Sequence, residues 1–327
     1  MNIYDIAKAS GVSTATVSRV LNGSERVSEQ TRRKVLSVME AQGYRPNAFA
    51  RGLGLGTMRM VGILCTDVSD PFYASAVSLL EGALRRMDYD MLLYCTGSEP
   101  ADRDRYVELL LDRHVDAILL VGSVFADPSG PALEKAAAQI PVVLINGSVP
   151  DGNIYCVDSD VEAAFRSAVS RLFSAGARRI LYLYDVLTYG GRMKLSGYRD
   201  GLSACGIPYD PSLCVRLERD PDSAVRSLRG LIAGGLSFDA VLCAEDLFAV
   251  AAGKALRGAS LSAPVIGCNN SILAVCASPA LTSIDMMLES LCETAANTLN
   301  ILLEGRQAPH RAVISSRLVE RETFRLP

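Results

Sequence analysis

The sequence predicts an N-terminal all-α helix-turn-helix domain followed by an α/β body of two doubly wound parallel-sheet subdomains. Within the first 46 residues, three short apolar stripes of helical spacing are separated by polar or glycine-containing turns. From residue 60 onward, short aliphatic runs alternate with amphipathic helical patterns, which is typical of parallel sheets covered by helices on both faces. This body, at 267 residues, exceeds one typical domain, so two α/β halves are expected.

Start and stop signals divide the first segment into three helices. Asn2 is a suitable N-cap, Asp5 complements the helix N-terminus, and Gly11 suits the left-handed position after the last turn. Ser13 and Ser28 are expected to cap the second and third helices. The buried faces are predicted to consist of Ile6 and Ala9, then Val17, Val20 and Leu21, and finally Val35, Val38 and Met39.

The outward face of the second helix carries short hydroxylated side chains and one arginine, so this helix can lie close in a major groove. Thr14 and Ala15 can contact base edges or a thymine methyl group, and Arg19 can make a bidentate contact with guanine. The candidate DNA-contacting residues of this face are Ser13, Thr14, Ala15, Thr16, Ser18 and Arg19. A plain three-helix cap with a solvated basic face is the alternative interpretation.

The charge of the chain is unevenly distributed. Residues 1–60 contain nine Lys or Arg and four acidic residues, a net charge of +5, whereas the remainder carries −8. This asymmetry is typical of a phosphate-facing module attached to an acidic body.

The string YDIAKASGVSTATVSRVLNG, residues 4–23, closely resembles the helix-turn-helix signature of the lac repressor (LacI/GalR) family of bacterial transcription regulators. The match continues through VSEQTRRKV and GYRPNAFARGL. Tyr4 and Asn22, near the ends of the string, are added to the DNA-contacting set. The resemblance implies a repressor whose homodimer places two recognition helices in successive major grooves of a pseudo-palindromic operator in double-stranded DNA.

A hinge is expected after the third helix, because the residue before Pro46 avoids the α conformation. Asn47 can cap residues 48–53, a run too short to form a stable helix alone in water. In the resembled family this stretch folds into a hinge helix on operator DNA and inserts a leucine at the central base step. Leu53 lies in that register, with Ala50 on the same face. A flexible linker is the alternative.

The body contains these expected strands: 61–65, 91–94, 117–121, 142–146, 179–184, 240–244 and 265–269. The expected helices between them include 73–86, 102–113, 161–175, 223–233 and 247–256. Segments such as RMVGILCTDVSDPFYASAVSLLEGAL and FDAVLCAEDLFAVAAGKAL resemble the family's effector domain, which has the fold of periplasmic sugar-binding proteins.

The expected domain organisation follows from these patterns and from the resemblance. Residues 1–46 would form the helix-turn-helix domain and 47–59 the hinge helix and linker. Residues 60–158 would form the first effector subdomain, to which a helix at 288–304 returns. Residues 159–287 would form the second subdomain, with 305–327 packing on the body.

Ligands of parallel α/β sheets bind outside the carboxyl ends of the strands. The residues at those ends are Asp67, Asp70, Phe72, Tyr73, Asn146, Asp158, Arg192, Glu245, Asp246 and Asn269. By register, the resemblance implies that Phe72 and Tyr73 stack on a small-molecule effector, a sugar or related metabolite. The effector set suggested by this register is Asp70, Phe72, Tyr73, Asn146, Arg192, Glu245 and Asn269.

Three positions depart from the family pattern. The family usually has Asp where this chain has Asn269 and Asn where it has Glu245, and it favours Gly-His where this chain has Gly176-Ala177. The first two of these departures change the chemistry of the pocket, so no particular sugar can be carried over. Glu245 adds a charged group that only accepts hydrogen bonds, which favours polyols or a cationic group.

Several classes of function have no support in the sequence. Nine Cys without a C-x-x-C pair and only two His give no metal-site spacing, so neither a metal nor a cofactor is expected. The cysteines are interpreted as small buried hydrophobic residues in a reducing cytosol. Catalytic motifs, a signal peptide and an apolar run of 18 residues are absent, which favours a cytoplasmic, nucleoid-associated protein that is neither an enzyme nor membrane-bound.

Two other functions remain as alternatives. A solute (sugar)-binding protein without DNA regulation would share the body, although no export signal precedes it. A sugar-modifying enzyme on the same fold would need a nucleophile–base pair or a phosphate loop, and neither motif occurs.

Overall fold

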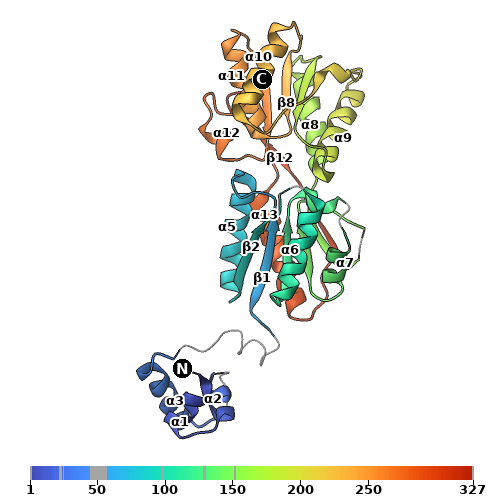
Figure 1. Cartoon of the computed structure of the whole chain (residues 1–327). Coiled ribbons are helices and arrows are strands. Elements are labelled where there is room, and N and C mark those ends of the chain that lie inside the picture. The colour runs from blue at the N-terminus through green and yellow to red at the C-terminus, as the bar shows by residue number, and fades with distance from the viewer. Residues whose placement is uncertain are drawn as a thin grey trace.

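The computed structural model of the chain describes residues 2–21, 24, 26–44, 57–97, 99–127, 130–150 and 152–325 (Figure 1). It has the predicted fold class: a group of three short helices, then two α/β subdomains that each contain a largely parallel sheet.

The N-terminal helices begin at capping residues and enclose one small core. They are α1 (Ile3–Ser10), α2 (Thr14–Leu21) and α3 (Glu29–Ala41). The side-chain oxygen of Asn2 accepts hydrogen bonds from the amides of Tyr4 and Asp5, at 2.9 and 3.1 Å. The hydroxyl oxygen of Ser13 accepts one from the amide of Thr16 at 3.1 Å, and Gly11 ends α1 in the left-handed conformation. These hydrogen bonds satisfy amide groups that the first helical turn leaves unpaired.

The buried face of α1 differs from the predicted stripe by one position. Ile6, Ala7 and Ser10 are buried, whereas Ala9 is exposed. Because α1 packs against both α2 and α3, its contact surface is centred nearer Ala7 than a stripe built on Ile6 and Ala9 would be. The core is completed by Val17, Val20, Val35 and Met39.

The first α/β subdomain is built on a six-stranded sheet whose order is β11-β5-β4-β3-β1-β2, with every neighbouring pair parallel. Its strands are β1 (Met60–Cys65), β2 (Asp90–Cys95), β3 (Ala117–Val121), β4 (Val142–Ile145), β5 (Ile154–Ser159) and β11 (Arg311–Ile314). Its helices are α5 (Pro71–Arg86), α6 (Pro100–Asp112), α7 (Pro131–Ala137) and α13 (Leu288–Leu303), with a short 3-10 turn η1 (Ser123–Ala126).

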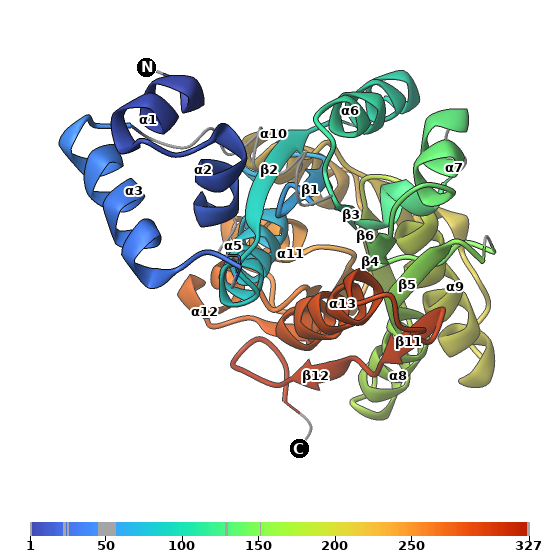
Figure 2. The ribbon, with the colours of Figure 1, turned by 90° about the horizontal axis from the view of Figure 1, so that it is seen from below.

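Helices cover both faces of this sheet, as Figure 2 shows from below. On one face, α5 and α13 pack against alternate strand residues such as Val61, Ile63 and Leu119. On the other face, α6 and α7 pack against the intervening residues, among them Ile118 and Leu120. Burial on both faces explains why the sequence of β3 is an uninterrupted aliphatic run.

The second subdomain repeats this plan with the order β12-β10-β9-β8-β6-β7, in which only the β10–β12 pair is antiparallel among the described strands. Its strands are β6 (Ile180–Tyr184), β7 (Cys214–Arg216), β8 (Ala240–Cys243), β9 (Val265–Cys268), β10 (Thr282–Asp285) and β12 (Arg317–Val319). Its helices are α8 (Val161–Ser174), α9 (Tyr189–Ala204), α10 (Pro221–Ala233), α11 (Asp246–Gly258) and α12 (Ile272–Cys276), with a 3-10 turn η2 (Pro211–Leu213).

The chain passes between the two subdomains three times within the described residues. The passages join β5 to α8, β10 to α13, and β11 to β12. As a result, α13 and β11 complete the first subdomain although they come late in the sequence (Figure 1).

Several short elements lie outside the strands expected from sequence. Strands β5, β7, β10, β11 and β12 have three to six residues each, and three of them, β7, β11 and β12, are edge strands whose side chains are only partly buried or exposed. The cysteines also differ from expectation, because Cys95 and Cys276 are exposed and Cys205 and Cys214 are only partly buried.

Helices α8 and α9 make the most extensive contact between two elements of the body, and glycine permits it. A Cβ built on Gly197 would lie 2.2 Å from the carbonyl oxygen of Glu162 on α8. By contrast, a Cβ on Gly230 in α10 would meet no atom within 4 Å.

We therefore expect opposite effects from two alanine substitutions. Gly197→Ala should destabilise the protein by about 1–3 kcal/mol because the helices must separate. Gly230→Ala should stabilise it by about 0.5–1 kcal/mol because alanine restricts the unfolded chain. Urea denaturation of both variants beside the wild type measures this, and equal effects of the two substitutions would contradict the account of the α8–α9 contact.

Candidate functional site

The residues of the predicted recognition helix lie largely on its outer side. Ser13, Ala15 and Arg19 are exposed, and Thr14, Thr16 and Ser18 are partly exposed, while Val17 and Val20 face the core. Tyr4 on α1 exposes 70% of its surface. Asn22, Asn47, Ala50 and Leu53 lie outside the described residues.

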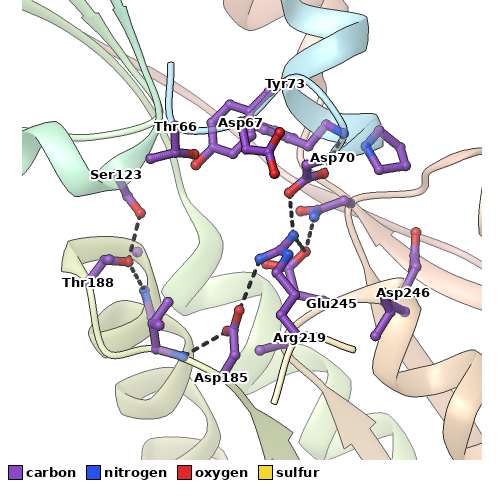
Figure 3. A pocket seen from close by; sticks show the side chains of 18 of the residues that line it. Thr66, Asp67, Asp70, Tyr73, Ser123, Asp185, Thr188, Arg219, Glu245 and Asp246 are labelled. Atoms are coloured by element: carbon purple, nitrogen blue, oxygen red, sulfur yellow. Dashed lines mark hydrogen bonds and ion pairs between the residues drawn. The ribbon is translucent and has the colours of Figure 1, made fainter. Parts of the chain in front are cut away.

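A second candidate site lies where the two sheets of the body face each other. The carboxyl ends of β1, β3 and β4 from the first subdomain and of β6, β8 and β9 from the second surround a cavity of about 1000 Å³. Both polar and aromatic side chains line it, and Figure 3 shows ten of them with labels. Its size is suited to a small organic molecule.

The loop after β1 supplies one wall of the cavity. Asp70 caps α5 by accepting a hydrogen bond from the amide of Phe72 at 2.8 Å, and this cap fixes the start of the helix. Phe72 and Tyr73 lie in the first turn of α5, with their rings edge to face at 5.4 Å between centroids. Burial raises the pKa of the Tyr73 phenol to about 12, so it stays protonated at neutral pH.

Glycine leaves room for this aromatic wall. Gly122, at the end of β3, has a φ of 118°, and a Cβ there would lie 2.8 Å from the Tyr73 ring. A side chain at this position would therefore both strain the backbone and displace the tyrosine.

The guanidinium of Arg219 lies between three carboxylates, as the dashed lines in Figure 3 show. It donates to Asp70 across the cavity and to Asp185 at 3.0 Å, and it lies 3.7 Å from Glu245. In both Asp70 and Asp185, the other carboxylate oxygen accepts a hydrogen bond from a backbone amide, so the fold fixes the positions of these side chains. Although burial opposes its charge, these carboxylates, Glu245 foremost, raise the pKa of Arg219 above its ordinary value.

A buried ion pair forms the floor on the side of the second subdomain. The ammonium of Lys194 donates to the carbonyl oxygen of Ala244 at 2.7 Å and to Glu245 at 3.2 Å. Asn269 donates from its side-chain amide to the other carboxylate oxygen of Glu245. Burial raises the pKa of Glu245 above its usual range, and Lys194 followed by Arg219 oppose that rise.

The structure brings most of the predicted effector residues to this cavity. Asp70, Phe72, Tyr73, Asn146, Glu245 and Asn269 line it, together with Asp67 and Asp246 from the wider set. Asp246 is tied to the fold, since its carboxylate accepts hydrogen bonds from the hydroxyls of Ser271 and Ser283. Asp158 lies elsewhere, where it accepts from the phenol of Tyr189 at 2.7 Å.

Arg192 lies outside the cavity, in contrast to its predicted place. Its guanidinium donates to Asp127 of the first subdomain at 2.7 Å and to the carbonyl oxygen of Leu187. The face of α9 that lines the cavity consists of Gly190, Gly191 and Lys194. On a helix these positions share one side, and residue 192 points to another.

Sequence reasoning missed Arg219, Asp185 and Lys194. Asp185 directly follows β6, so the strand-end rule that selected Asn146 would have selected it too. Arg219 follows the three-residue strand β7, which carries too short an apolar run to be recognised. Lys194 lies within α9, and only its exact position on the helix determines that it faces the cavity while its neighbours do not.

Other kinds of site find no support in the described parts of the chain. Within those ranges, no group of three or more His, Cys, Asp or Glu residues is placed to hold a metal ion. None of the helices described there has the length and hydropathy needed to cross a membrane.

Comparison with known proteins identifies both parts of the chain. Residues 2–47 match the model of "Bacterial regulatory proteins, lacI family", and residues 169–324 match that of a periplasmic binding protein-like domain. An HTH-type transcriptional regulator of Lachnoclostridium phytofermentans is 44% identical over 330 residues, which cover 99% of each chain.

Two solved structures have the same fold. The transcriptional regulator CelR in complex with cellobiose has a TM-score of 0.73 at 29% identity and covers 99% of this chain and 100% of its own. The lac repressor dimer bound to operator and the anti-inducer ONPF has a TM-score of 0.87 at 23% identity and covers 99% and 98%. The predictions of a regulator, of its fold and of a non-enzymatic role are therefore confirmed, and the chain belongs to the lacI family of bacterial regulatory proteins.

Proposed function

We propose that the protein is a cytoplasmic, nucleoid-associated repressor that binds a pseudo-palindromic operator as a homodimer and responds to a carbohydrate effector in the cavity between its two α/β subdomains. The observation that carries this proposal is the combination of a helix-turn-helix domain with two opposed sheets that enclose a polar cavity of about 1000 Å³. In their solved structures, the lac repressor dimer is bound to operator and CelR is in complex with cellobiose.

The proposed DNA-contacting residues are those on the outer face of α2. Ser13, Thr14, Ala15, Thr16, Ser18 and Arg19 are short or flexible enough to reach base edges, while the capped start of the helix favours phosphate contacts. Tyr4 is added because of its exposure on α1. Asn22, Asn47, Ala50 and Leu53, which fall outside the described residues, complete the proposed set in the turn and the hinge.

The proposed effector site consists of Asp70, Phe72, Tyr73, Asn146, Glu245 and Asn269, to which we add Arg219, Asp185 and Lys194. The aromatic wall suits the apolar face of a sugar ring, and the carboxylates and amides suit its hydroxyl groups. Arg192 is proposed instead to act at the subdomain boundary, through its ion pair with Asp127.

Coupling between the two sites follows from the contacts between the two subdomains, inside the cavity and beside it. Arg219 with Asp70, Ser123 with Thr188, and Tyr189 with Asp158 each join one subdomain to the other. An effector that changes these contacts changes the relative position of the subdomains, and therefore that of β1, which follows the linker. The resulting coupling free energy acts in both directions, so operator DNA alters effector affinity by the same factor.

The test of this proposal is binding-site selection from random duplex DNA, followed by titration of the selected duplex with and without sugars. We expect a two-fold symmetric site and a sugar-dependent change in operator affinity. Equal affinity for selected and random duplexes would overturn the proposal that the protein is an operator-specific repressor. If operator affinity stayed the same with every sugar that binds, the proposed regulation by an effector would be overturned.

Replacing Arg19 should relax base preference at one position in each half-site. Arg19→Ala removes the bidentate contact with guanine, and the loss of discrimination there should be about 1–3 kcal/mol. Arg33→Ala is the matched control, since Arg33 is exposed on α3 and pairs with Glu29. Selection with all three proteins measures the preference, and an unaltered preference in Arg19→Ala would refute its assignment as the base-reading residue.

Removing the aromatic wall should weaken sugar binding. Tyr73→Ala is expected to raise the dissociation constant of a sugar that binds the wild type up to about tenfold, because ring stacking contributes about 0.5–1.5 kcal/mol. Tyr209→Ala, on an exposed tyrosine away from the cavity, is the control. Isothermal titration measures both, and equal affinities for the Tyr73 variant and the wild type would contradict the stacking role.

The buried pair at the cavity floor should give a pH-dependent stability effect. Lys194→Met leaves the Glu245 carboxylate buried without its main partner and should destabilise the fold by about 3–5 kcal/mol at pH 7. Burial raises the pKa of Glu245 in the folded state, so protonation of this carboxylate favours folding. The loss of stability in Lys194→Met should therefore become smaller as the pH falls through that pKa.

Chemical denaturation between pH 4 and pH 8, each value relative to the wild type at the same pH, measures this effect. The double variant Lys194→Met with Glu245→Gln is the control, because its neutral amide should remove most of the pH dependence. If the loss of stability in the single variant does not change with pH, the buried charge of Glu245 is not its cause.

A further inference from the structure

Two cysteines lie side by side at the carboxyl ends of neighbouring strands. Cys65 is the last residue of β1 and Cys95 the last residue of β2, and the register of this parallel pair places them directly opposite each other. Their sulfur atoms are 4.0 Å apart. Cys65 is buried, whereas Cys95 is exposed, so one thiol of the pair is open to solvent.

The backbone geometry of this pair is compatible with a disulfide bond. Neighbouring strands lie about 4.7–4.9 Å apart, and disulfides join Cα atoms that are about 4.4–6.8 Å apart. The sulfur atoms would need to approach from 4.0 Å to about 2.05 Å. Because both residues end their strands and Cys95 is exposed, side-chain rotation can supply most of this movement.

The pair also adjoins the effector cavity. Thr96 donates its backbone amide to the carbonyl oxygen of Cys65 at 2.8 Å, and Gly97 donates to that of Thr66 at 3.0 Å. Thr66 and Gly97 both line the cavity. Any change at the two sulfur atoms therefore acts where the loop carrying Asp70 and Tyr73 leaves the sheet.

From this geometry we propose that Cys65 and Cys95 form a reversible, oxidant-responsive disulfide site, a modification site separate from DNA binding and effector binding. The oxidant is a hydroperoxide. The sulfur of Cys95 attacks the O–O bond and becomes a sulfenic acid, and the alkoxide that leaves takes a proton to become an alcohol or, from hydrogen peroxide, water. The thiol of Cys65 then attacks this sulfur, the S–S bond forms, and water leaves. Two thiols lose two electrons in total, and the hydroperoxide gains them.

The order of the two steps follows from exposure and acidity. Cys95 meets the oxidant first because it is exposed. Burial, and after it the neighbouring Cys95, raises the pKa of the Cys65 thiol to about 12, so Cys65 is a poor first nucleophile and serves as the resolving thiol. Cys276 is also exposed, but it ends α12 in the other subdomain and does not lie opposite Cys65.

The disulfide should tighten the wall of the cavity. It would join the strand ends from which residues 66–73 and 96–97 emerge, so local opening of these segments should become less frequent. We expect backbone amide exchange in 66–73 to slow by roughly twofold or more on oxidation.

The test treats the reduced full-length protein with hydrogen peroxide, blocks free thiols with an alkylating reagent, and maps peptides by mass spectrometry without reductant. We expect one peptide cross-linked between Cys65 and Cys95, lighter by about 2 Da than the sum of its reduced parts and released by dithiothreitol. Cys65→Ser should instead accumulate sulfenic acid at Cys95, trapped by dimedone. Cys276→Ser, the matched control, should form the cross-link at the wild-type rate.

Three outcomes would overturn the proposal. They are oxidation of Cys95 to sulfinic acid without a cross-link, a cross-link between two copies of the chain, and a cross-link that uses another cysteine in place of Cys65. An unchanged amide exchange rate in 66–73 after the bond has formed would overturn its coupling to the cavity. None of these results depends on an operator or an effector, so they leave the proposed function to its own tests.

Discussion

The body of this protein depends on one electrostatic constraint: the parallel strands of the two sheets direct their carboxyl ends at each other, and acidic side chains gather between them. Asp70, Asp185 and Glu245 converge on a single guanidinium, and Glu245 also pairs with Lys194. A carboxylate in this environment is costly without a cation. The positions of Arg219 and Lys194 are therefore required by the same topology that creates the cavity.

This constraint links the cavity to the arrangement of the subdomains. Arg219 comes from the second subdomain and Asp70 from the first, so the ion pair that neutralises this carboxylate in the cavity also joins the two subdomains. Asp70 also caps α5 through its other carboxylate oxygen. A ligand that competes for this carboxylate therefore acts on the start of a helix and on the subdomain contact at once. Each subdomain has its own hydrophobic core, and the described chain passes between them three times.

Local signals predicted much of this structure. The helix-turn-helix could be predicted because caps such as Asn2 and the glycine turn at Gly11 act within a few residues. The aliphatic strands of both sheets were recognised because burial on two faces requires uninterrupted apolar runs. The strand-end rule then selected Asp70, Asn146, Glu245 and Asn269, all of which line the cavity.

The remainder depended on register and on contacts distant in sequence. Arg192 and Lys194 are two residues apart, and only the start of α9 at Tyr189 decides which of them faces the cavity. Arg219 follows the three-residue strand β7, and its partners come from three separate segments. The edge strands β11 and β12 have only four and three residues, and none of their side chains is fully buried, so their sequences give too short a pattern to predict a strand.

The late return of the chain also determines the order in which the protein can mature during synthesis. The first subdomain lacks α13 and the edge strand β11 until residue 314 has been made, and the second lacks β12 until residue 319. While the ribosome is still translating the second half, one face of the first sheet is therefore covered by α5 without α13. The apolar residues that α13 later covers stay exposed until translation is nearly finished, and such surface is prone to aggregation. The DNA-binding helices, whose core is complete by residue 44, can by contrast fold as soon as they emerge.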